Sequence, residues 1–145
     1  MATAYLRLSW EEIAADSRAL AGRLRADAPY RGLIAITRGG LVPAAILACE
    51  LGLKLIETIG ISSYQGEHAQ APLLLKPQAI TADGEGFIVV DDLVDSGATM
   101  LMLRDMLPKA RHVVLYAKPD GEALADMFVR KVPQDTWIVF PWDPP

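Results

Sequence analysis

Three carboxylates and a short polar loop lie together in the segment Val89–Thr99, whose sequence is VVDDLVDSGAT. Asp91, Asp92 and Asp95 supply the carboxylates, and the loop Ser96–Thr99 includes two hydroxyls. Backbone N–H groups at the start of a helix suit a phosphate monoester, because the helix dipole favours an anion there. Adjacent carboxylates suit sugar hydroxyls or a hard cation such as Mg²⁺. The alternative is that these acidic residues are solvated loop residues without a ligand.

The glycines near this segment match neither of the two common nucleotide-binding loops. No Gly-Lys-Ser/Thr sequence follows the carboxylates, as a P-loop requires. Gly84-x-Gly86 lacks a third glycine and precedes a strand instead of following one. The segment therefore predicts a phosphate and sugar site of another kind.

Alternating strands and helices must position these residues. Short apolar runs predict buried strands at Leu33–Thr37, Phe87–Val90 and His112–Ala117. The other expected elements are a surface helix that starts at a capping box over Ser9–Glu12, helices over Leu41–Leu51 and Ala98–Leu107, a β-rich stretch over Leu53–Ser62, a long mobile loop over residues 65–77, and extended segments over Met127–Val132 and Trp137–Phe140. This order predicts one α/β domain, residues 1–145, with a mostly parallel central sheet flanked by helices. Ligands of such sheets bind at the carboxyl ends of the strands.

Size and charge narrow the classes of partner. The chain has 145 residues, of which 52% are hydrophobic, and a net charge of −4. Because its basic residues are scattered, we expect no nucleic-acid partner. Its one cysteine, Cys49, cannot close an intrachain disulfide and is expected to pack as a small buried hydrophobe. No apolar run approaches the ~20 residues of a membrane span and no signal peptide is evident, so we expect a cytoplasmic protein without a transmembrane segment.

The segment Val89–Thr99 resembles the 5-phosphoribosyl-1-pyrophosphate (PRPP) motif of the type I phosphoribosyltransferases. That motif is a hydrophobic run followed by Asp-Asp, two apolar residues and Asp-Ser/Thr-Gly-x-Thr. Three further segments occur in the same order as in that family, namely Thr37–Gly40, Tyr116–Pro119 and Gln134–Ile138. Nearly the whole chain therefore resembles the bacterial members that act on purines. The resemblance implies the type I phosphoribosyltransferase fold with a flexible hood loop.

The resemblance also implies a role for each residue of the site. The residues that would bind PRPP and its phosphates are Arg38, Gly39, Asp91, Asp92, Ser96, Gly97, Ala98 and Thr99, and those that would bind the purine are Asp95, Lys118, Trp137 and Ile138. Asp92 would also approach Mg²⁺, and Asp95 would take a proton from the purine as its ring nitrogen attacks the sugar. Lys118 would donate to the six-oxo group of the purine. The loop around Arg38 would clamp pyrophosphate, often with a cis peptide bond that does not precede proline.

The implied function is purine salvage by Mg²⁺-dependent transfer of phosphoribosyl from PRPP to a 6-oxopurine. Guanine, xanthine or hypoxanthine would give GMP, XMP or IMP together with pyrophosphate. The resemblance further implies a homotetramer or homodimer, which the apolar content of so small a chain favours. It implies a cytoplasmic location, with peripheral association with the inner membrane as an alternative.

The chain departs from the family pattern in two places. Residues 65–75 offer no Lys or Arg to pyrophosphate, only His68, with Lys76 just beyond them. Val139 follows Ile138 where the family often has an acidic residue, and Asp143 is the candidate to replace it.

Two other functions stay open at this level. The acceptor could be another base, such as adenine or a pyrimidine, although the amino group of adenine cannot accept from the Lys118 ammonium. The same fold could also serve as a PRPP-binding or nucleotide-binding transcription regulator. The acidic net charge and the presence of Asp95 count against a regulator.

Overall fold

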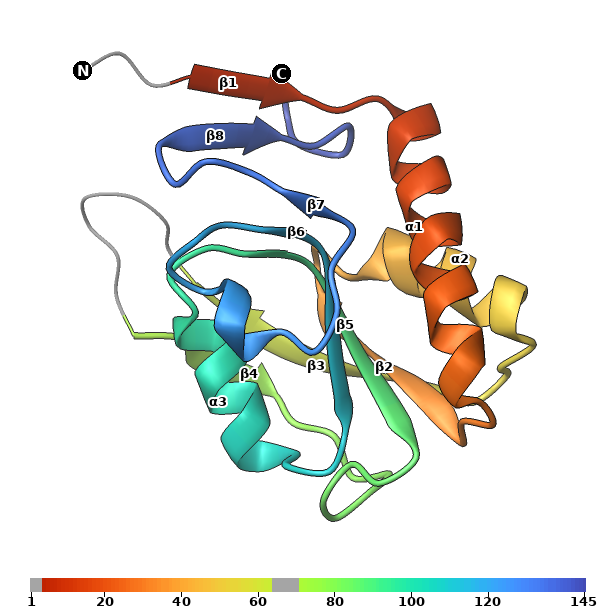
Figure 1. The fold of residues 1–145 in the computed structure, drawn as a ribbon. Helices are drawn as coiled ribbons and strands as arrows, with labels where there is room; N and C mark the ends of the chain where they lie inside the picture. The colour runs from red at the N-terminus through yellow and green to blue at the C-terminus, as the bar shows by residue number, and fades with distance from the viewer. Residues whose placement is uncertain (1–3, 64–70) are drawn as a thin grey trace.

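The computed structural model describes residues 4–63 and 71–145, which form two sheets (Figure 1). The larger sheet has the strand order β4-β3-β2-β5-β6-β7, and its neighbours are parallel except for β3 and β4. Its strands are β2 (Gly32–Thr37), β3 (Ile56–Ser62), β4 (Leu73–Lys76), β5 (Phe87–Val94), β6 (Arg111–Ala117) and β7 (Arg130–Lys131). The smaller sheet pairs β1 (Ala4–Arg7) with β8 (Thr136–Val139) in parallel. The predicted α/β fold with a mostly parallel sheet is confirmed.

Helices cover both faces of the larger sheet (Figure 1). These are α1 (Trp10–Leu24) and α2 (Leu41–Leu51) on one face, α3 (Ala98–Met106) on the other, and the short 3₁₀ turns η1 (Arg25–Asp27) and η2 (Glu122–Leu124). Side chains alternate along β2, so Leu33 and Ala35 pack with α1 and α2, whereas Ile34 and Ile36 pack with α3. This explains why the strand is an unbroken apolar run.

Local sequence determines where the first two helices begin and end. The Ser9 hydroxyl accepts a hydrogen bond from the Glu12 backbone N–H at 3.1 Å, and the Glu12 carboxylate accepts one from the Ser9 N–H at 2.8 Å. The predicted capping box at the start of α1 is therefore confirmed. Helix α2 ends at Gly52, whose φ of +68° lies in the left-handed region that favours glycine.

The chain leaves the central strands β2 and β5 in opposite directions. Helix α2 leads from β2 to β3 on one side, and α3 leads from β5 to β6 on the other. The loops after β2 and β5 therefore open beside each other. We call the end of the sheet with the loops after β2, β5 and β6 the carboxyl edge, and the opposite end the amino edge. A reversal of this kind is where open α/β sheets bind ligands.

Three strands differ from the expectations drawn from the sequence. The sequence gives no signal for β1, which is a short strand held by pairing with the distant β8. Strand β4 lies within the stretch predicted as a loop over residues 65–77, of which residues 65–70 lie outside the described residues. Strand β5 continues past the predicted end at Val90 to Val94, because its pairing with β6 continues.

Two further expectations are corrected. The extended segment over Met127–Val132 holds only the two-residue strand β7 and an isolated bridge at Met127. Cys49 is exposed on α2, so the prediction that it packs as a buried hydrophobe is wrong.

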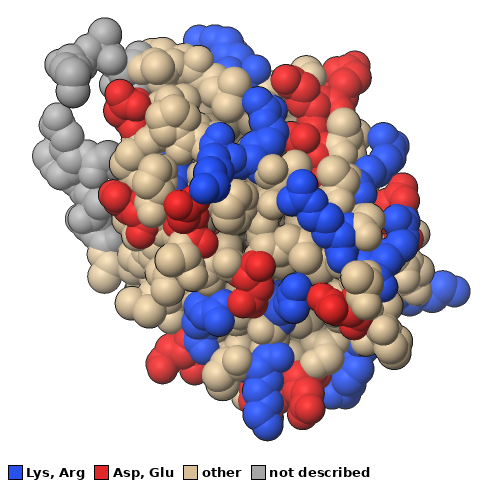
Figure 2. Space-filling model, viewed as in Figure 1, with Lys and Arg blue, Asp and Glu red and all other residues tan. Residues whose placement is uncertain are grey.

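Acidic and basic residues are mixed on the surface. Lys and Arg side chains are interspersed with Asp and Glu on the face drawn in Figure 2. Among residues 4–63 and 71–145, no helix is both long enough and apolar enough to cross a membrane.

Candidate active site

The carboxylates of Asp91 and Asp92 lie in the second half of β5, between its neighbours β2 and β6. The Asp91 carboxylate accepts a hydrogen bond from the Asp92 backbone N–H at 2.8 Å. Burial raises the pKa of both carboxyl groups, and the charge of Asp91 raises the pKa of Asp92 further. In the described part of the chain, neither side chain forms an ion pair with Lys or Arg. The pair therefore favours a ligand that donates hydrogen bonds or carries positive charge.

The loop after β2 approaches this pair through two glycines. A Cβ atom on Gly39 would overlap the Asp92 carboxylate, and one on Gly40 would overlap the backbone carbonyl oxygens of Val90 and Ile36. Only residues without a side chain allow the loop to come this close to β5. The peptide bond between Thr37 and Arg38 is cis, and the Arg38 side chain is exposed. The loop thus brings the Gly39 backbone next to the Asp92 carboxylate, with the exposed Arg38 side chain one residue before it.

The loop Ser96–Thr99 leads into α3. Gly97 is the N-cap residue with φ +95°, and a Cβ there would lie 2.8 Å from Leu124 Cδ1. Gly97 provides no side-chain cap, and the Ser96 hydroxyl accepts from the Ala98 N–H at 3.3 Å. A helix that starts without a capping side chain directs its first N–H groups toward an anion. The structure therefore places Ser96–Thr99 at the start of α3, and phosphate binding by this loop stays a prediction.

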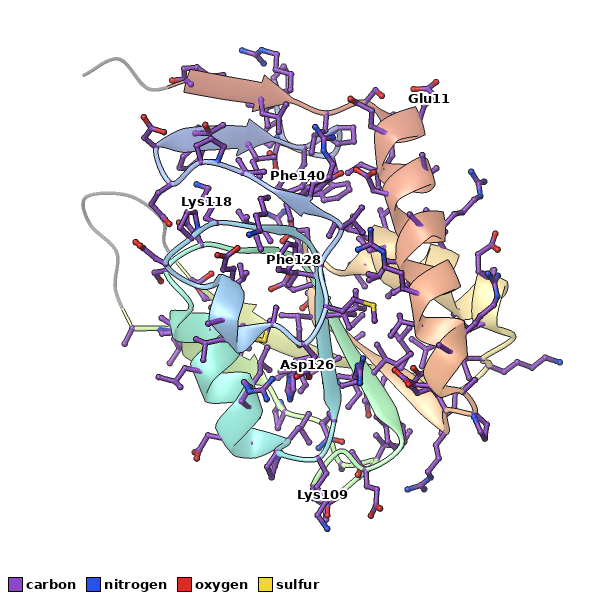
Figure 3. All side chains as sticks on the ribbon, in the orientation of Figure 1. Glu11, Lys109, Lys118, Asp126, Phe128 and Phe140 are labelled. Atoms are coloured by element: carbon purple, nitrogen blue, oxygen red, sulfur yellow. The ribbon has the colours of Figure 1, made fainter. Side chains whose placement is uncertain are left out.

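The Asp95 carboxylate lies between two donors from other strands. Lys118 follows β6, and its Nζ donates to Asp95 Oδ2 at 3.3 Å. Gln134 follows β7, and its Nε2 donates to Asp95 Oδ1 at 2.7 Å. The Lys118 side chain is 4% exposed and the Asp95 side chain 24% exposed. Figure 3 labels Lys118 at the carboxyl edge, far from Lys109 at the amino edge.

Trp137 and Ile138 are neighbours in β8 and point to opposite sides. The Trp137 side chain is 42% exposed, which leaves its indole face free for stacking, whereas Ile138 is 5% exposed and belongs to the core. Ile138 can therefore meet a ligand only through its backbone. Asp143 is the candidate to replace the acidic residue that the family often has after Ile138. In the structure its carboxylate accepts a hydrogen bond from the Phe140 backbone N–H at 2.8 Å.

The predicted residues meet in two groups. Gly39 lies against Asp92, and Lys118 lies against Asp95. Sequence reasoning missed Gln134, because nothing in the residues around it indicates a contact with a side chain 39 positions away. The one signal for it was its place at the start of the segment that also holds Trp137.

Comparison with known proteins places this arrangement in a family. The family model for the phosphoribosyl transferase domain matches residues 8–145. The xanthine-guanine phosphoribosyltransferase of Gluconobacter oxydans is 49% identical over 142 residues, which cover 96% of this chain and 84% of that protein. The xanthine-guanine phosphoribosyltransferase of Idiomarina loihiensis is 50% identical over 137 residues, which cover 94% of this chain and 85% of that protein.

Solved structures share the fold. A purine phosphoribosyltransferase from Pyrococcus horikoshii matches with a TM-score of 0.80 and 28% identity, covering 97% of this chain and 95% of that one. A xanthine-guanine-hypoxanthine phosphoribosyltransferase from Helicobacter pylori matches with a TM-score of 0.75 and 26% identity, covering 95% and 93%. The chain therefore belongs to the phosphoribosyl transferase family and, within it, to the xanthine-guanine phosphoribosyltransferases. The predicted type I fold is confirmed.

Proposed function

We propose that the carboxyl edge transfers phosphoribosyl from PRPP to guanine, xanthine or hypoxanthine, giving GMP, XMP or IMP and pyrophosphate. Membership of the family makes the chain a purine phosphoribosyltransferase that acts in purine salvage. The observation that supports the catalytic assignment best is the Asp95 carboxylate, which is held by Lys118 and Gln134 directly before the loop Ser96–Thr99.

PRPP would lie across the loops after β2 and β5. Asp91 and Asp92 would accept hydrogen bonds from the ribose hydroxyls, and Ser96–Thr99 would bind the 5-phosphate through N–H groups and hydroxyls. Backbone N–H groups around Gly39 would bind the pyrophosphate, and Arg38 would neutralise the charge that develops on it. The negative charges of the substrate are thus met by dipoles and by Arg38, while the aspartates meet the hydroxyls.

The acceptor purine would lie beside Asp95. Its imidazole-ring nitrogen forms a bond to the anomeric carbon as the bond from that carbon to the pyrophosphate oxygen breaks, and the electron pair leaves with pyrophosphate. The proton on the purine ring passes to the Asp95 carboxylate. Lys118 would donate to the six-oxo group, and the Trp137 indole would stack on the ring. The buried Lys118 ammonium favours an oxo acceptor, because an amino group would leave a donor facing a donor.

Enzymes of this family typically use Mg²⁺. The residues fit this cation, since the two adjacent carboxylates form no ion pair with Lys or Arg in the described residues. Mg²⁺ is usually held by one or two carboxylates together with substrate phosphates, and Asp91 and Asp92 would supply such carboxylates. Asp92 would hold Mg²⁺, which when bound supplies charge neutralisation for the pyrophosphate.

We also propose that the chain forms a homodimer or homotetramer. In the edge strand β4, Leu73 is 61% exposed and Leu75 is 64% exposed, and Leu41 of α2 is 45% exposed. Exposed leucines on the outermost strand of a sheet are typical of a surface that another chain covers. Light scattering should give the mass of an oligomer for the wild type and a smaller mass for Leu75→Lys. A monomeric wild type would contradict this proposal.

A comparison of acceptor bases tests the activity. Initial rates of pyrophosphate release should be measured with PRPP, Mg²⁺ and each of guanine, xanthine, hypoxanthine and adenine. We expect turnover of the three 6-oxopurines and none of adenine. Turnover of adenine alone would overturn the acceptor assignment, and no turnover of any base, with salt-dependent binding of nucleic acid, would favour a regulator.

A further inference from the structure

The side-chain amide of Gln134 joins three loops at the carboxyl edge. Its Nε2 donates to Asp95 Oδ1 at 2.7 Å, and its Oε1 accepts from the Asp120 backbone N–H at 2.9 Å. Asp95 follows β5, Asp120 follows β6 and Gln134 follows β7. One side chain therefore connects loops that the chain places up to 39 positions apart.

The chemistry of the two partners determines which way the amide faces. An ionised carboxylate can only accept a hydrogen bond, and a backbone N–H can only donate one. The amide satisfies both partners in one orientation alone, with its nitrogen toward Asp95. No other uncharged side chain of this length offers a donor and an acceptor on one planar group.

The residues proposed to contact the purine lie within these three loops or close to them in the chain. Lys118 lies two residues before Asp120, and Trp137 lies three residues after Gln134. Figure 1 shows β8, which contains Trp137, starting on the side where β5 and β6 end. A displacement of the Gln134 amide would therefore also displace Asp95, Lys118 and Trp137.

The two donors to Asp95 are unequal. The hydrogen bond from Gln134 is 2.7 Å long, and the one from Lys118 is 3.3 Å long. In the proposed reaction, Lys118 turns toward the six-oxo group and Asp95 Oδ2 turns to the purine proton. Gln134 then remains as the donor that holds Asp95 Oδ1.

We infer that Gln134 is a positioning residue that holds the Asp95 carboxylate with Oδ2 toward the acceptor purine. The inference rests on the proposed role of Asp95. Gln134 does not touch the reacting atoms, and it acts through the orientation of Asp95. Loss of Gln134 should therefore change kcat and the use of the acceptor base. It should leave the KM for PRPP unchanged, because the proposed contacts of PRPP are with Asp91, Asp92 and Ser96–Thr99.

Two substitutions separate the hydrogen bond to Asp95 from the hydrogen bond with Asp120. Gln134→Met removes both hydrogen bonds at similar length, whereas Gln134→Glu can still accept from the Asp120 N–H but places a carboxylate against Asp95. We expect both variants to lose about 10- to 100-fold in kcat, because a small misplacement of a reacting group has effects of this size. The KM for PRPP should stay within about twofold of the wild type. The matched control is Asp135→Asn, an exposed neighbour in the same loop, which should keep wild-type kinetics.

The result for Gln134→Glu decides between the two roles. If Gln134→Glu keeps wild-type kcat, the Gln134 side chain serves only to hold the loop at Asp120, and the inference is wrong. A rise in the KM for PRPP with unchanged kcat would also overturn it. Asp95→Asn is measured in parallel, since full activity of that variant contradicts the proposed role of Asp95 itself. Loss in Asp95→Asn with full activity in both Gln134 variants contradicts the positioning role alone.

Discussion

The two edges of the larger sheet hold their charges in different ways. At the amino edge, acidic and basic side chains form ion pairs, which are Arg111–Asp27 at 3.0 Å, Arg104–Asp126 at 3.2 Å and Lys109–Asp83 at 3.4 Å. At the carboxyl edge, Asp91 and Asp92 lie beside each other, and burial and like charge raise the pKa of Asp92. Lys118 also pairs with Asp95 at the carboxyl edge, at 3.3 Å, so the contrast between the two edges rests on Asp91 and Asp92. Adjacent buried carboxylates without a basic partner in the described residues indicate a ligand.

A hollow surface does not distinguish the edges. The amino edge has a cleft lined by residues that include Tyr30, Pro108 and Arg111, yet the charges around it are paired with one another. The carboxyl edge instead combines perturbed carboxylates, glycines that allow close approach and a buried lysine. Chemistry, and not concavity, separates the site from the rest of the surface.

The largest effect is expected from Asp95→Asn. This change removes the proposed proton acceptor and keeps the size of the side chain, so kcat for guanine, xanthine and hypoxanthine should fall by about 10²- to 10⁴-fold. Steady-state rates with saturating PRPP measure it, and circular dichroism confirms that the variant is folded. Undiminished turnover on all three bases would show that Asp95 is not the acid/base residue.

The next largest effect is expected from Gly39→Ala. The new Cβ overlaps the Asp92 carboxylate and must displace it, so the KM for PRPP should rise by about 100-fold or kcat should fall by that factor. Gly52→Ala is the control, because nothing lies within 4 Å of its Cβ position and its positive φ affects only the helix end. Equal kinetics for the two alanine variants would remove the argument for close approach at Gly39.

Matched changes at the two edges should shift stability in opposite directions. A carboxyl group whose pKa is raised by folding binds more protons in the folded chain, so its ionisation destabilises the fold as pH rises through that interval. Asp92→Asn should therefore stabilise the free protein in urea at pH 7, and the gain should shrink as pH falls toward the ordinary aspartate pKa of 3.8.

Asp83→Asn at the amino edge provides the opposite sign. A hydrogen bond from the Glu85 N–H and the ion pair with Lys109 lower the pKa of Asp83, so its ionised form stabilises the fold above the ordinary pKa, and this contribution is lost as pH falls. Asp83→Asn should lose stability at pH 7. Urea midpoints measured against pH for both variants check this, and shifts of the same sign would contradict the contrast between the edges.

The smallest effect is expected from Lys109→Met. The Lys109–Asp83 pair is exposed, and exposed ion pairs contribute little to stability. Turnover should stay within about twofold of the wild type and Tm should fall only slightly. A large loss of activity would mean that the amino edge takes part in catalysis.

The sequence predicts the arrangement of the residues proposed to bind PRPP better than the arrangement of those proposed to bind the purine. Asp91, Asp92 and the loop Ser96–Thr99 lie within nine consecutive residues, so one motif places them at the end of a strand and the start of the next helix. Parallel strands bring the loop after β2 to the same edge, which the fold class also predicts. The closeness of Gly39 to Asp92 needed coordinates, because it depends on the separation of two backbones.

The residues proposed to bind the purine come from distant segments of the chain. Lys118 follows from the family resemblance, but its contact with Asp95 and the bridging role of Gln134 depend on packing between loops after three different strands. Short strands such as β1 and β4 carry too few residues for a reliable period, and tertiary pairing determines them. Local patterns therefore specify most of the elements, and non-local contacts complete the proposed acceptor site.

The pairing of β1 with β8 has a consequence for how the enzyme unfolds. Residues about 130 positions apart must meet to form this sheet, and it has only two strands, so its opening should require less free energy than opening of the six-stranded sheet. Amide hydrogens of β8 should exchange with solvent before those of β5. Under mild denaturation, β8 with Trp137 should therefore detach first, while β5 and the proposed ribose and phosphate residues stay folded.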